Sequence, residues 1–358
     1  MSLAPLHPAR YWRRLDDGRF ACELCPRGCR LRPGQRAYCF VREATEDGLV
    51  LSTYGRSTGF CLDPIEKKPL HHFLPGTPVL SFGTAGCNLG CRFCQNWDTS
   101  RSRETDRASA AATPEAIARA AVTSGARSVA FTYNDPVVWA EYAIDTALAC
   151  REAGVRTVAV TAGYVSAPAR ADLFAVMDAA NVDLKAMSDG FYRALCSATL
   201  APVLETIAWL VRETPVWVEL TTLLVPGHND SEAELHALSA WVAEHLGPDV
   251  PLHLSAFHPA HRLTNVPRTP LATLTRARRI AREHGLHHVY TGNVHDPEGD
   301  ATRCSACDTL LVARNWYALE AWALTPDGRC PTCGLALPGV FEPRPGTWGA
   351  RRQPLAIR

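Results

Sequence analysis

Short apolar runs alternate with longer segments of helical pattern between residues 78 and 293. The runs are rich in Val and Leu and do not alternate strictly between apolar and polar side chains, which is typical of strands covered on both faces. We therefore expect seven strands, at PVLSF (78–82), SVAFT (128–132), RTVAVT (156–161), NVDLK (181–185), PVWVEL (215–220), PLHLSAF (251–257) and HHVYT (287–291).

The segments between these runs carry helix punctuation. Thr113 precedes Pro114, an N-cap followed by a first-turn proline, and Gly125 closes the segment. A second segment of this kind spans residues 269–285. The repeated strand-then-helix order predicts an α/β protein whose parallel sheet curls into a partial (β/α)6-type TIM barrel. A doubly wound open sheet is the alternative architecture.

We expect three units: a cysteine-rich N-terminal region (1–77), the partial barrel (78–293), and a zinc-ribbon-like C-terminal region with its tail (294–358). The tail from Glu342 onward is rich in Pro, Gly and Arg and is expected to fray. In a barrel of this kind, the chemistry lies just after the carboxyl ends of the strands.

Charge and hydropathy exclude some classes of partner. The 358 residues include 37 Lys plus Arg and 36 Asp plus Glu, for a formal charge of +1. This balance removes the electrostatic reason to expect a nucleic-acid or membrane-surface partner. No apolar run approaches the ~18 residues of a membrane helix, and the first residues lack the apolar stretch of a secretory signal. We expect a cytoplasmic protein with no membrane partner.

The chain has 14 cysteines, and most of them fall in three tight groups. In a reducing compartment, grouped cysteines are metal ligands or redox groups more often than disulfides. Cys61, Cys150 and Cys196 lie outside the groups, and Cys150 is expected in the core because its surroundings are apolar.

The central group, Cys87, Cys91 and Cys94, has the spacing C-x3-C-x2-C directly after the first strand. A closed zinc site needs four ligands, and the loop offers no fourth cysteine or histidine. Three thiolates can instead hold three irons of a [4Fe–4S] cluster and leave the fourth iron open. A zinc site whose fourth ligand comes from elsewhere in the chain, or thiols with no shared function, are the alternatives.

Phe93, directly before the third cysteine, could stack on a planar ring or pack in the core. The loop also has glycines that suit a backbone wrapped around a compact inorganic core, Gly83, Gly86 and Gly90.

Blocks along nearly the whole chain resemble one protein family. They are DPIEKKPLHHFLPG, GCNLGCRFCQNWDTS, FTYNDP, NVDLKA, WVELTTLLVPGHND, HLSAFHP and VYTGNVHD. The sequence resembles the AmmeMemoRadiSam system radical S-adenosylmethionine (SAM) proteins, relatives of the pyruvate formate-lyase activating enzymes. The resemblance implies that the three cysteines hold a [4Fe–4S] cluster, whose open iron binds the amine and carboxylate of SAM. It also implies reductive cleavage of SAM to a 5′-deoxyadenosyl radical that removes a hydrogen atom from a substrate.

The resemblance also assigns SAM contacts. Tyr133, Asn134 and Asp135 end the second strand, where the amine-binding segment of the family lies, although many relatives carry Glu in place of Asp135. A simple turn closed by proline is the alternative. Asp183 and Lys185 share one face of a strand and could address the SAM carboxylate and ribose; a solvated edge strand is the alternative.

Several further residues are candidates for contacts to SAM or substrate, with structural roles as the alternative: Thr161, Gly163, Tyr164, His253, Phe257 and His258. His71 and His72 lie in the block before the first strand, which we expect to be a solvated connector.

Both flanks carry four cysteines. Those of the N-terminal flank suit a closed site for zinc or for an auxiliary iron–sulfur cluster: Cys22, Cys25, Cys29 and Cys39. Those of the C-terminal flank form two C-x2-C knuckles that favour zinc over iron: Cys304, Cys307, Cys330 and Cys333. The segment between the knuckles is not strongly basic, so a structural clip is favoured over nucleic-acid binding.

We therefore expect a radical SAM enzyme that acts on a protein or a small molecule. A glycyl-radical protein and the partner proteins of the AmmeMemoRadiSam system are candidate partners, and reduced flavodoxin or ferredoxin is the expected electron donor. The hypothesis from another class is a zinc-dependent adaptor or nucleic-acid-binding module without catalysis. The intact central cysteines argue against it.

Overall fold

The computed structural model describes residues 6–102 and 110–357. Its central feature is a nine-stranded sheet with the order β16-β15-β14-β13-β12-β11-β9-β8-β20. Seven of these strands are parallel and lie at or next to the ranges expected: β9 (Pro78–Phe82), β11 (Ser128–Phe131), β12 (Arg156–Thr161), β13 (Ala179–Asp183), β14 (Trp217–Leu224), β15 (Leu252–Ala256) and β16 (Val289–Gly292). The prediction of an α/β fold with a parallel sheet is confirmed.

The order of the parallel strands follows the order of the chain. Each new strand adds beside the previous one, from β9 to β16, without the reversal that defines a doubly wound sheet. The doubly wound alternative is therefore wrong. Within the described part of the chain, no strand pairing joins β16 to the other end of the sheet. Closure into a partial barrel stays a prediction.

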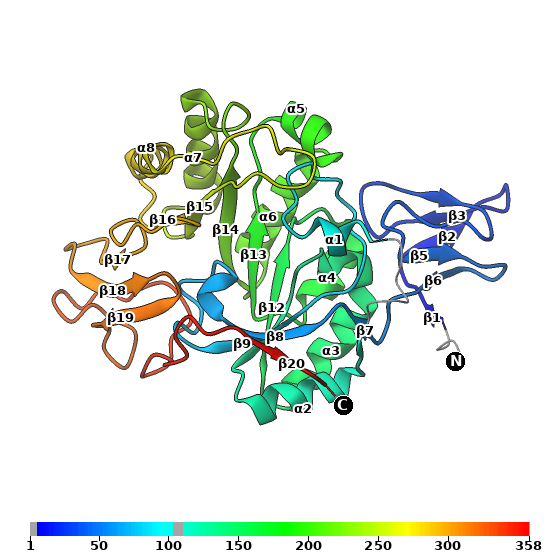
Figure 1. Ribbon diagram of the computed structural model, residues 1–358, viewed down its shortest axis with the longest axis horizontal. Coiled ribbons are helices and arrows are strands. Elements are labelled where there is room, and N and C mark those ends of the chain that lie inside the picture. Colours follow the sequence, from blue (N-terminus) through cyan, green and yellow to red (C-terminus); the bar gives the residue numbers. More distant parts are fainter. Residues whose placement is uncertain (1–5, 103–109, 358) are drawn as a thin grey trace.

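Each flank adds one antiparallel strand to this sheet. β8 (Phe60–Pro64) pairs with β9, and β20 (Gln353–Leu355) pairs with β8. The C-terminal strand appears in red beside β8 in Figure 1. The expectation of a frayed tail is thus wrong, because the edge of β8 offers unpaired backbone groups that residues 353–355 satisfy.

The helices begin and end largely where the capping residues in the sequence predict. In α2 (Pro114–Ser124), the Thr113 hydroxyl accepts a hydrogen bond from Ala116 N at 3.2 Å, and Gly125 ends the helix with φ 73°. For α8 (Leu271–Glu283), Thr269 does not cap the helix, because its hydroxyl donates to Leu224 O at 2.6 Å.

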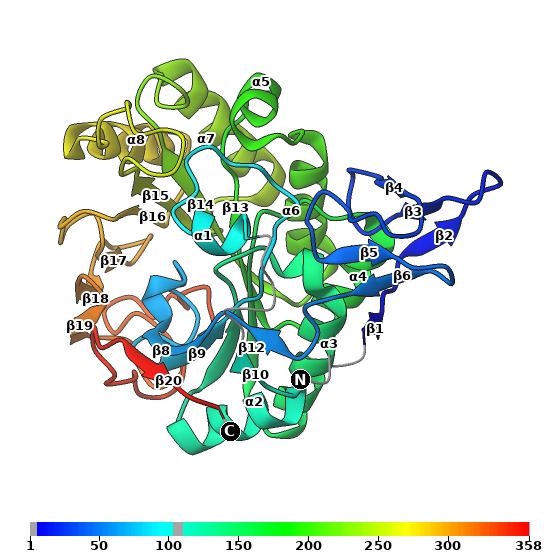
Figure 2. The same cartoon turned by 45° about the vertical axis from the view of Figure 1, so that its right-hand side comes forward.

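The remaining helices and helical turns are α1 (Trp97–Ser100), α3 (Ala140–Glu152), α4 (Ala167–Phe174), α5 (Asp189–Phe191), α6 (Ala201–Glu213), α7 (Glu232–Leu246), η1 (Ile65–Lys67), η2 (Pro136–Trp139) and the π-turn η3 (Tyr192–Cys196). Consecutive long helices contact one another, α2 with α3, α3 with α4, α6 with α7 and α7 with α8. In Figures 1 and 2 they surround the central strands. Cys150, in α3, is fully buried as predicted.

The two cysteine-rich flanks lie on opposite sides of the sheet (Figure 1). The N-terminal flank has two small sheets, one of β1 (His7–Pro8), β6 (Leu49–Leu51) and β5 (Arg42–Ala44), the other of β2 (Trp12–Arg14), β3 (Phe20–Cys22) and β4 (Arg30–Leu31), and β7 (Arg56–Ser57) pairs with β10 (Ala110–Ala111). The C-terminal flank is a sheet of β17 (Thr302–Arg303), β18 (Leu310–Asn315) and β19 (Ala318–Trp322). The division into three units stays a prediction.

Among the described residues, no single helix is both long and apolar enough to cross a membrane. One pair of segments, Asp189–Cys196 and Ala201–Glu213, passes that test when joined, but it is bent by 110°.

Candidate active site

A cavity of about 310 Å³ brings the three central cysteines together with residues that follow the parallel strands. Cys87, Cys91 and Cys94 line it from the loop after β9. Residues 132–135 reach it from the end of β11, and Thr161 reaches it from the end of β12. The cavity therefore lies at the carboxyl ends of the strands, where a β/α barrel places its chemistry.

Glycines let the cysteine loop pack closely against the rest of the protein. A Cβ added at Gly83 would lie 2.2 Å from Thr132 O, and one at Gly86 would lie 2.1 Å from Cys39 O. A Cβ at Gly90 would lie 2.3 Å from the hydroxyl of Tyr38 in the N-terminal flank. The loop thus requires glycine because of neighbouring protein groups, a reason that the sequence alone did not indicate.

Asn134 fixes the start of the same loop. Its Nδ2 donates to Ala85 O at 3.1 Å and to Gly86 O at 2.8 Å, and its Oδ1 accepts from Thr84 N at 2.9 Å. Because its amide is committed to the loop backbone, Asn134 positions the cysteines even though it also lines the cavity.

Asp135 joins the ends of β11 and β12. Its Oδ1 accepts from Thr161 Oγ1 and its Oδ2 from Ala162 N, both at 2.9 Å. Burial raises the pKa of this carboxyl, while the hydrogen bonds from Ala162, Val137 and Thr161 oppose the rise. The carboxylate is therefore largely satisfied within the protein.

Asp183 and Lys185 form an ion pair that faces the cavity. Lys185 Nζ lies 2.7 Å from Asp183 Oδ2, and both residues line the cavity. Burial acts to lower the pKa of Lys185, but the charges of Asp183 and Cys91 raise it well above its usual value. The alternative of a solvated edge strand is wrong, because β13 lies between β12 and β14.

The thiols have different neighbours. Leu89 N donates to Cys87 Sγ at 3.4 Å, and Cys94 Sγ lies 3.3 Å from a serine hydroxyl in α1. Cys91 hydrogen-bonds to Cys196, and this bond is the first cause of a raised Cys91 pKa, ahead of burial. Cys196 ends a π-turn, a feature frequent at functional sites, and is fully buried outside the cavity lining. The sequence spacing gave no signal for this contact.

Two aromatic residues expected near SAM do reach the cavity. Phe93 is 4% exposed, and the centroid of its ring lies 5.8 Å from the centroid of the Phe191 ring. Tyr133 has φ 69°, and its hydroxyl donates to Asp63 Oδ2 at 3.1 Å. Lys67, which the sequence did not single out, also lines the cavity.

Other expected contacts do not line it: Gly163, Tyr164, His253, Phe257 and His258. His253 is the second residue of β15 rather than a residue near its carboxyl end, and its Nε2 lies 2.7 Å from Glu219 Oε2. His253 therefore has the structural role given as the alternative, because its imidazole is buried against Glu219 within the sheet. Tyr164 instead accepts a hydrogen bond from Asn88 Nδ2 through its carbonyl, at 2.7 Å.

Comparison with known proteins shows which family this chain resembles. The Radical SAM superfamily matches residues 82–239. An uncharacterized protein of Methanocaldococcus jannaschii is 40% identical over 333 residues, which cover 92% of this chain and 98% of that protein. The pyruvate formate-lyase 1-activating enzyme of Escherichia coli is 26% identical over 196 residues, 51% of this chain and 75% of that enzyme.

This chain belongs to the radical SAM superfamily. Members of the superfamily are enzymes that use a [4Fe–4S] cluster and SAM. A crystal structure of a radical SAM methyltransferase from Sphaerobacter thermophilus is similar with a TM-score of 0.48 and 18% identity, covering 81% of this chain and 78% of that one.

The block of residues 63–76 in this radical SAM protein is buried, except for Lys67 and Pro69. The expectation of a solvated connector is wrong, because the polar side chains of the block find partners within the protein. Lys68 Nζ lies 2.7 Å from Asp63 Oδ2, and His71 Nε2 lies 2.6 Å from Asp300 Oδ1.

His72 belongs to the same buried network. Its Nδ1 lies 2.6 Å from Pro338 O and its Nε2 lies 2.6 Å from the Tyr290 hydroxyl. Arg314, from β18, donates to His71 O at 2.9 Å and to Thr302 Oγ1 at 2.9 Å. The network fastens the C-terminal flank to the amino side of the sheet.

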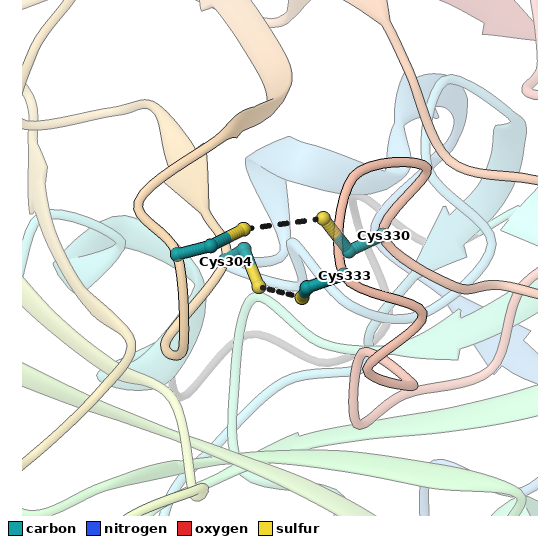
Figure 3. Close-up of side chains that lie close together, drawn as sticks. Cys304, Cys330 and Cys333 are labelled. Atoms are coloured by element: carbon teal, nitrogen blue, oxygen red, sulfur yellow. Dashed lines mark hydrogen bonds between the residues drawn. The ribbon is translucent and has the colours of Figure 1, made fainter.

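The four C-terminal cysteines meet at one point. Figure 3 shows Cys304 pointing toward Cys333, with their sulfurs 3.5 Å apart, and the sulfurs of Cys307 and Cys330 are 3.6 Å apart. All four sulfurs lie within 4.8 Å of one another, which is close enough to hold a single metal ion. Gly334, with φ 76°, makes the tight turn predicted after the second knuckle.

Proposed function

We propose that Cys87, Cys91 and Cys94 bind three irons of a [4Fe–4S] cluster and leave the fourth iron open to the cavity. The donor set fits this group, since three thiols from one loop line the cavity and no fourth cysteine or histidine is among the described residues that line it. That arrangement is the single observation on which the proposal rests.

When bound, the cluster supplies the electron for reductive cleavage of SAM to methionine and a 5′-deoxyadenosyl radical, which takes a hydrogen atom from the substrate. The protein contributes the remaining functions. Lys185, held by Asp183 at 2.7 Å, presents an ammonium group suited to the methionyl carboxylate, and Asp183 can accept a hydrogen bond from a ribose hydroxyl. Phe93 and Tyr133 provide aromatic walls beside the thiols.

The SAM amine would meet the segment 133–135. Because the carboxylate of Asp135 already accepts three hydrogen bonds, we assign the amine mainly to backbone carbonyls of this segment, with Asp135 and Thr161 fixing their position.

We further propose that the protein is the radical SAM enzyme of an AmmeMemoRadiSam system. The supporting observation is the series of sequence blocks that run through the chain. The similarity to an enzyme that activates pyruvate formate-lyase supports a protein substrate, a glycyl-radical protein or a partner of the system, over a small molecule. Reduced flavodoxin or ferredoxin is the proposed electron donor.

We also propose zinc at the C-terminal group as a structural clip. A zinc ion with Zn–S bonds of about 2.3 Å places tetrahedral thiolates about 3.8 Å apart, close to the two sulfur pairs at 3.5 and 3.6 Å. An adaptor without catalysis is not favoured, because such a protein has no use for three thiols that open on a cavity.

The experiment that tests the proposal is release of 5′-deoxyadenosine from SAM after anaerobic reconstitution and reduction with dithionite. The wild-type protein should release it, and Cys87→Ala, Cys91→Ala and Cys94→Ala should each abolish release, because each removes an iron ligand. Cys150→Ala is the matched control, since this cysteine is buried away from the cavity. Equal release from Cys94→Ala and Cys150→Ala would contradict the proposal.

A further inference from the structure

The four N-terminal cysteines lie in and beside one hairpin of the N-terminal flank. Cys22 N donates to Cys29 O at 2.8 Å, which closes the hairpin of β3 and β4, and Cys25 lies in the turn between them. Cys39 precedes β5. Burial is the main cause that raises the pKa of Cys25 to about 12, and the charges of the other three thiols contribute to this rise.

The spacing of these sulfurs differs from that of the C-terminal group. A single zinc ion needs thiolates about 3.8 Å apart. In the C-terminal group, all four cysteine sulfurs lie within 4.8 Å of one another. Among the described residues, the N-terminal cysteines do not form a group with sulfurs this close together. The cysteines at 87, 91 and 94 do not form one either. In a [4Fe–4S] cluster each thiolate binds a different iron, so the sulfurs stand farther apart than around one ion.

A buried cation accompanies the N-terminal thiols. Arg42 is fully buried, and it lies close enough to Cys22 and Cys39 for its charge to act on both thiols. Its Nη2 pairs with Glu141, but its Nε has no hydrogen-bond acceptor within the described part of the chain. A cluster with four thiolates carries sulfur acceptors, and one of them would satisfy the unpaired Nε–H.

The N-terminal site packs directly on the loop of the proposed active-site cluster. The backbone of Cys39 lies against Gly86, and Arg27 donates through Nε to Asn88 O and through Nη2 to Ser197 O. The ring of Tyr38 stacks under Arg27, with 3.5 Å from the guanidinium carbon to the ring centroid. Residues between and beside the N-terminal thiols therefore hold the loop that carries Cys87 and Cys91.

We propose that Cys22, Cys25, Cys29 and Cys39 bind a second [4Fe–4S] cluster, fully ligated by protein and without an open iron. The difference in sulfur spacing between the N-terminal and C-terminal groups does not depend on the proposed function. The similarity in sulfur spacing to Cys87, Cys91 and Cys94 does rest on the proposed function, because it assumes that those three cysteines bind a cluster.

The test is metal and sulfide analysis with Mössbauer spectroscopy on the full-length protein, reconstituted without oxygen. Two variants are compared with wild type: the triple variant Cys87→Ala/Cys91→Ala/Cys94→Ala, which leaves the N-terminal flank untouched, and Cys25→Ser/Cys29→Ser. Two [4Fe–4S] clusters require about eight irons and eight sulfides per chain in wild type, and about four of each in the triple variant with the doublet of a [4Fe–4S] cluster. Cys25→Ser/Cys29→Ser should also keep about four irons, in a cluster that still responds to SAM.

The outcomes separate the two proposals. About four irons in wild type and none in the triple variant, with a second zinc per chain, would overturn the second cluster and leave the proposed function intact. About four irons in both wild type and the triple variant would support the N-terminal cluster and overturn the assignment of the central cysteines.

Discussion

Arg42 Nη2 lies 2.5 Å from Glu141 Oε2, and both side chains are completely buried. The pair joins β5 of the N-terminal flank to α3, a helix that packs beside the central sheet. The other oxygen of Glu141 accepts a hydrogen bond from Arg10 N at 2.6 Å. Removing one partner of such a pair leaves an uncompensated buried charge, which costs far more than losing an exposed pair.

We therefore predict that Glu141→Ala lowers the free energy of unfolding by ~3–5 kcal/mol. Glu283→Ala, which breaks the exposed pair with Arg279, should change it by less than ~1 kcal/mol. Urea unfolding followed by circular dichroism measures both. Similar losses for the two variants would show that the buried pair does not fasten the flank.

A second prediction concerns Gly86 in the cysteine loop. Gly86→Ala must adopt φ 82° and would place its Cβ 2.1 Å from Cys39 O, so we expect a marked loss of bound iron after reconstitution. Gly227→Ala is the control, because Gly227 has φ 74° but nothing within 4 Å of an added Cβ. It carries the same backbone strain without the collision. Iron content is the measurement, and equal retention of iron in the two variants would refute the close packing of the loop.

A third prediction concerns the ammonium group that faces the cavity. Lys185→Met should weaken SAM binding by ~10-fold or more, the value of a charge-assisted hydrogen bond, with iron content unchanged. Lys185→Arg should recover part of the affinity, because it keeps the charge. Equilibrium binding of SAM to the reconstituted protein checks this. Unchanged affinity in Lys185→Met would remove Lys185 from the site.

The buried histidines predict loss of stability in acid. Burial is the main cause that lowers the pKa of His72 to about 4 and that of His288 to about 3, from 6.5. Below pH 6.5 the unfolded chain therefore binds protons that the folded chain does not, so stability falls with pH until the folded pKa is reached. At ~1.4 kcal/mol per pKa unit, His72 alone accounts for ~3 kcal/mol between pH 6.5 and 4.

Denaturant unfolding at pH 7.5 and pH 5 measures this effect. His72→Gln should flatten the dependence on pH, whereas His287→Asn should not, because His287 is exposed. A wild-type protein equally stable at both pH values would contradict the burial of neutral histidines.

The strands of the central sheet could be predicted because burial on both faces leaves a plain signal in the sequence. Apolar or β-branched residues make up most of the runs 78–82 and 156–161, and the observed strands β9 and β12 have the same bounds. The position of Cys87, Cys91 and Cys94 after the first strand followed from chain order alone. The sequence also placed Asp183 and Lys185 on one side of a strand; the two form an ion pair, but β13 ends at Asp183 and Lys185 lies beyond it.

Features that depend on contacts distant in sequence could not be predicted. Asp63 and Lys68 look like surface residues until their ion pair is seen, because each compensates the burial of the other. The pairing of residues 353–355 with β8 depends on an edge nearly 300 residues away in the chain. The contact of Cys91 with Cys196 requires a π-turn, which leaves no periodic signal.

The most direct test of the open iron is the low-temperature electron paramagnetic resonance spectrum of the dithionite-reduced protein with and without SAM. SAM should alter the cluster signal in wild type and leave the signal of the Cys94→Ala variant unchanged, because direct binding of SAM changes the environment of the iron. A wild-type spectrum that is identical with and without saturating SAM would contradict the account.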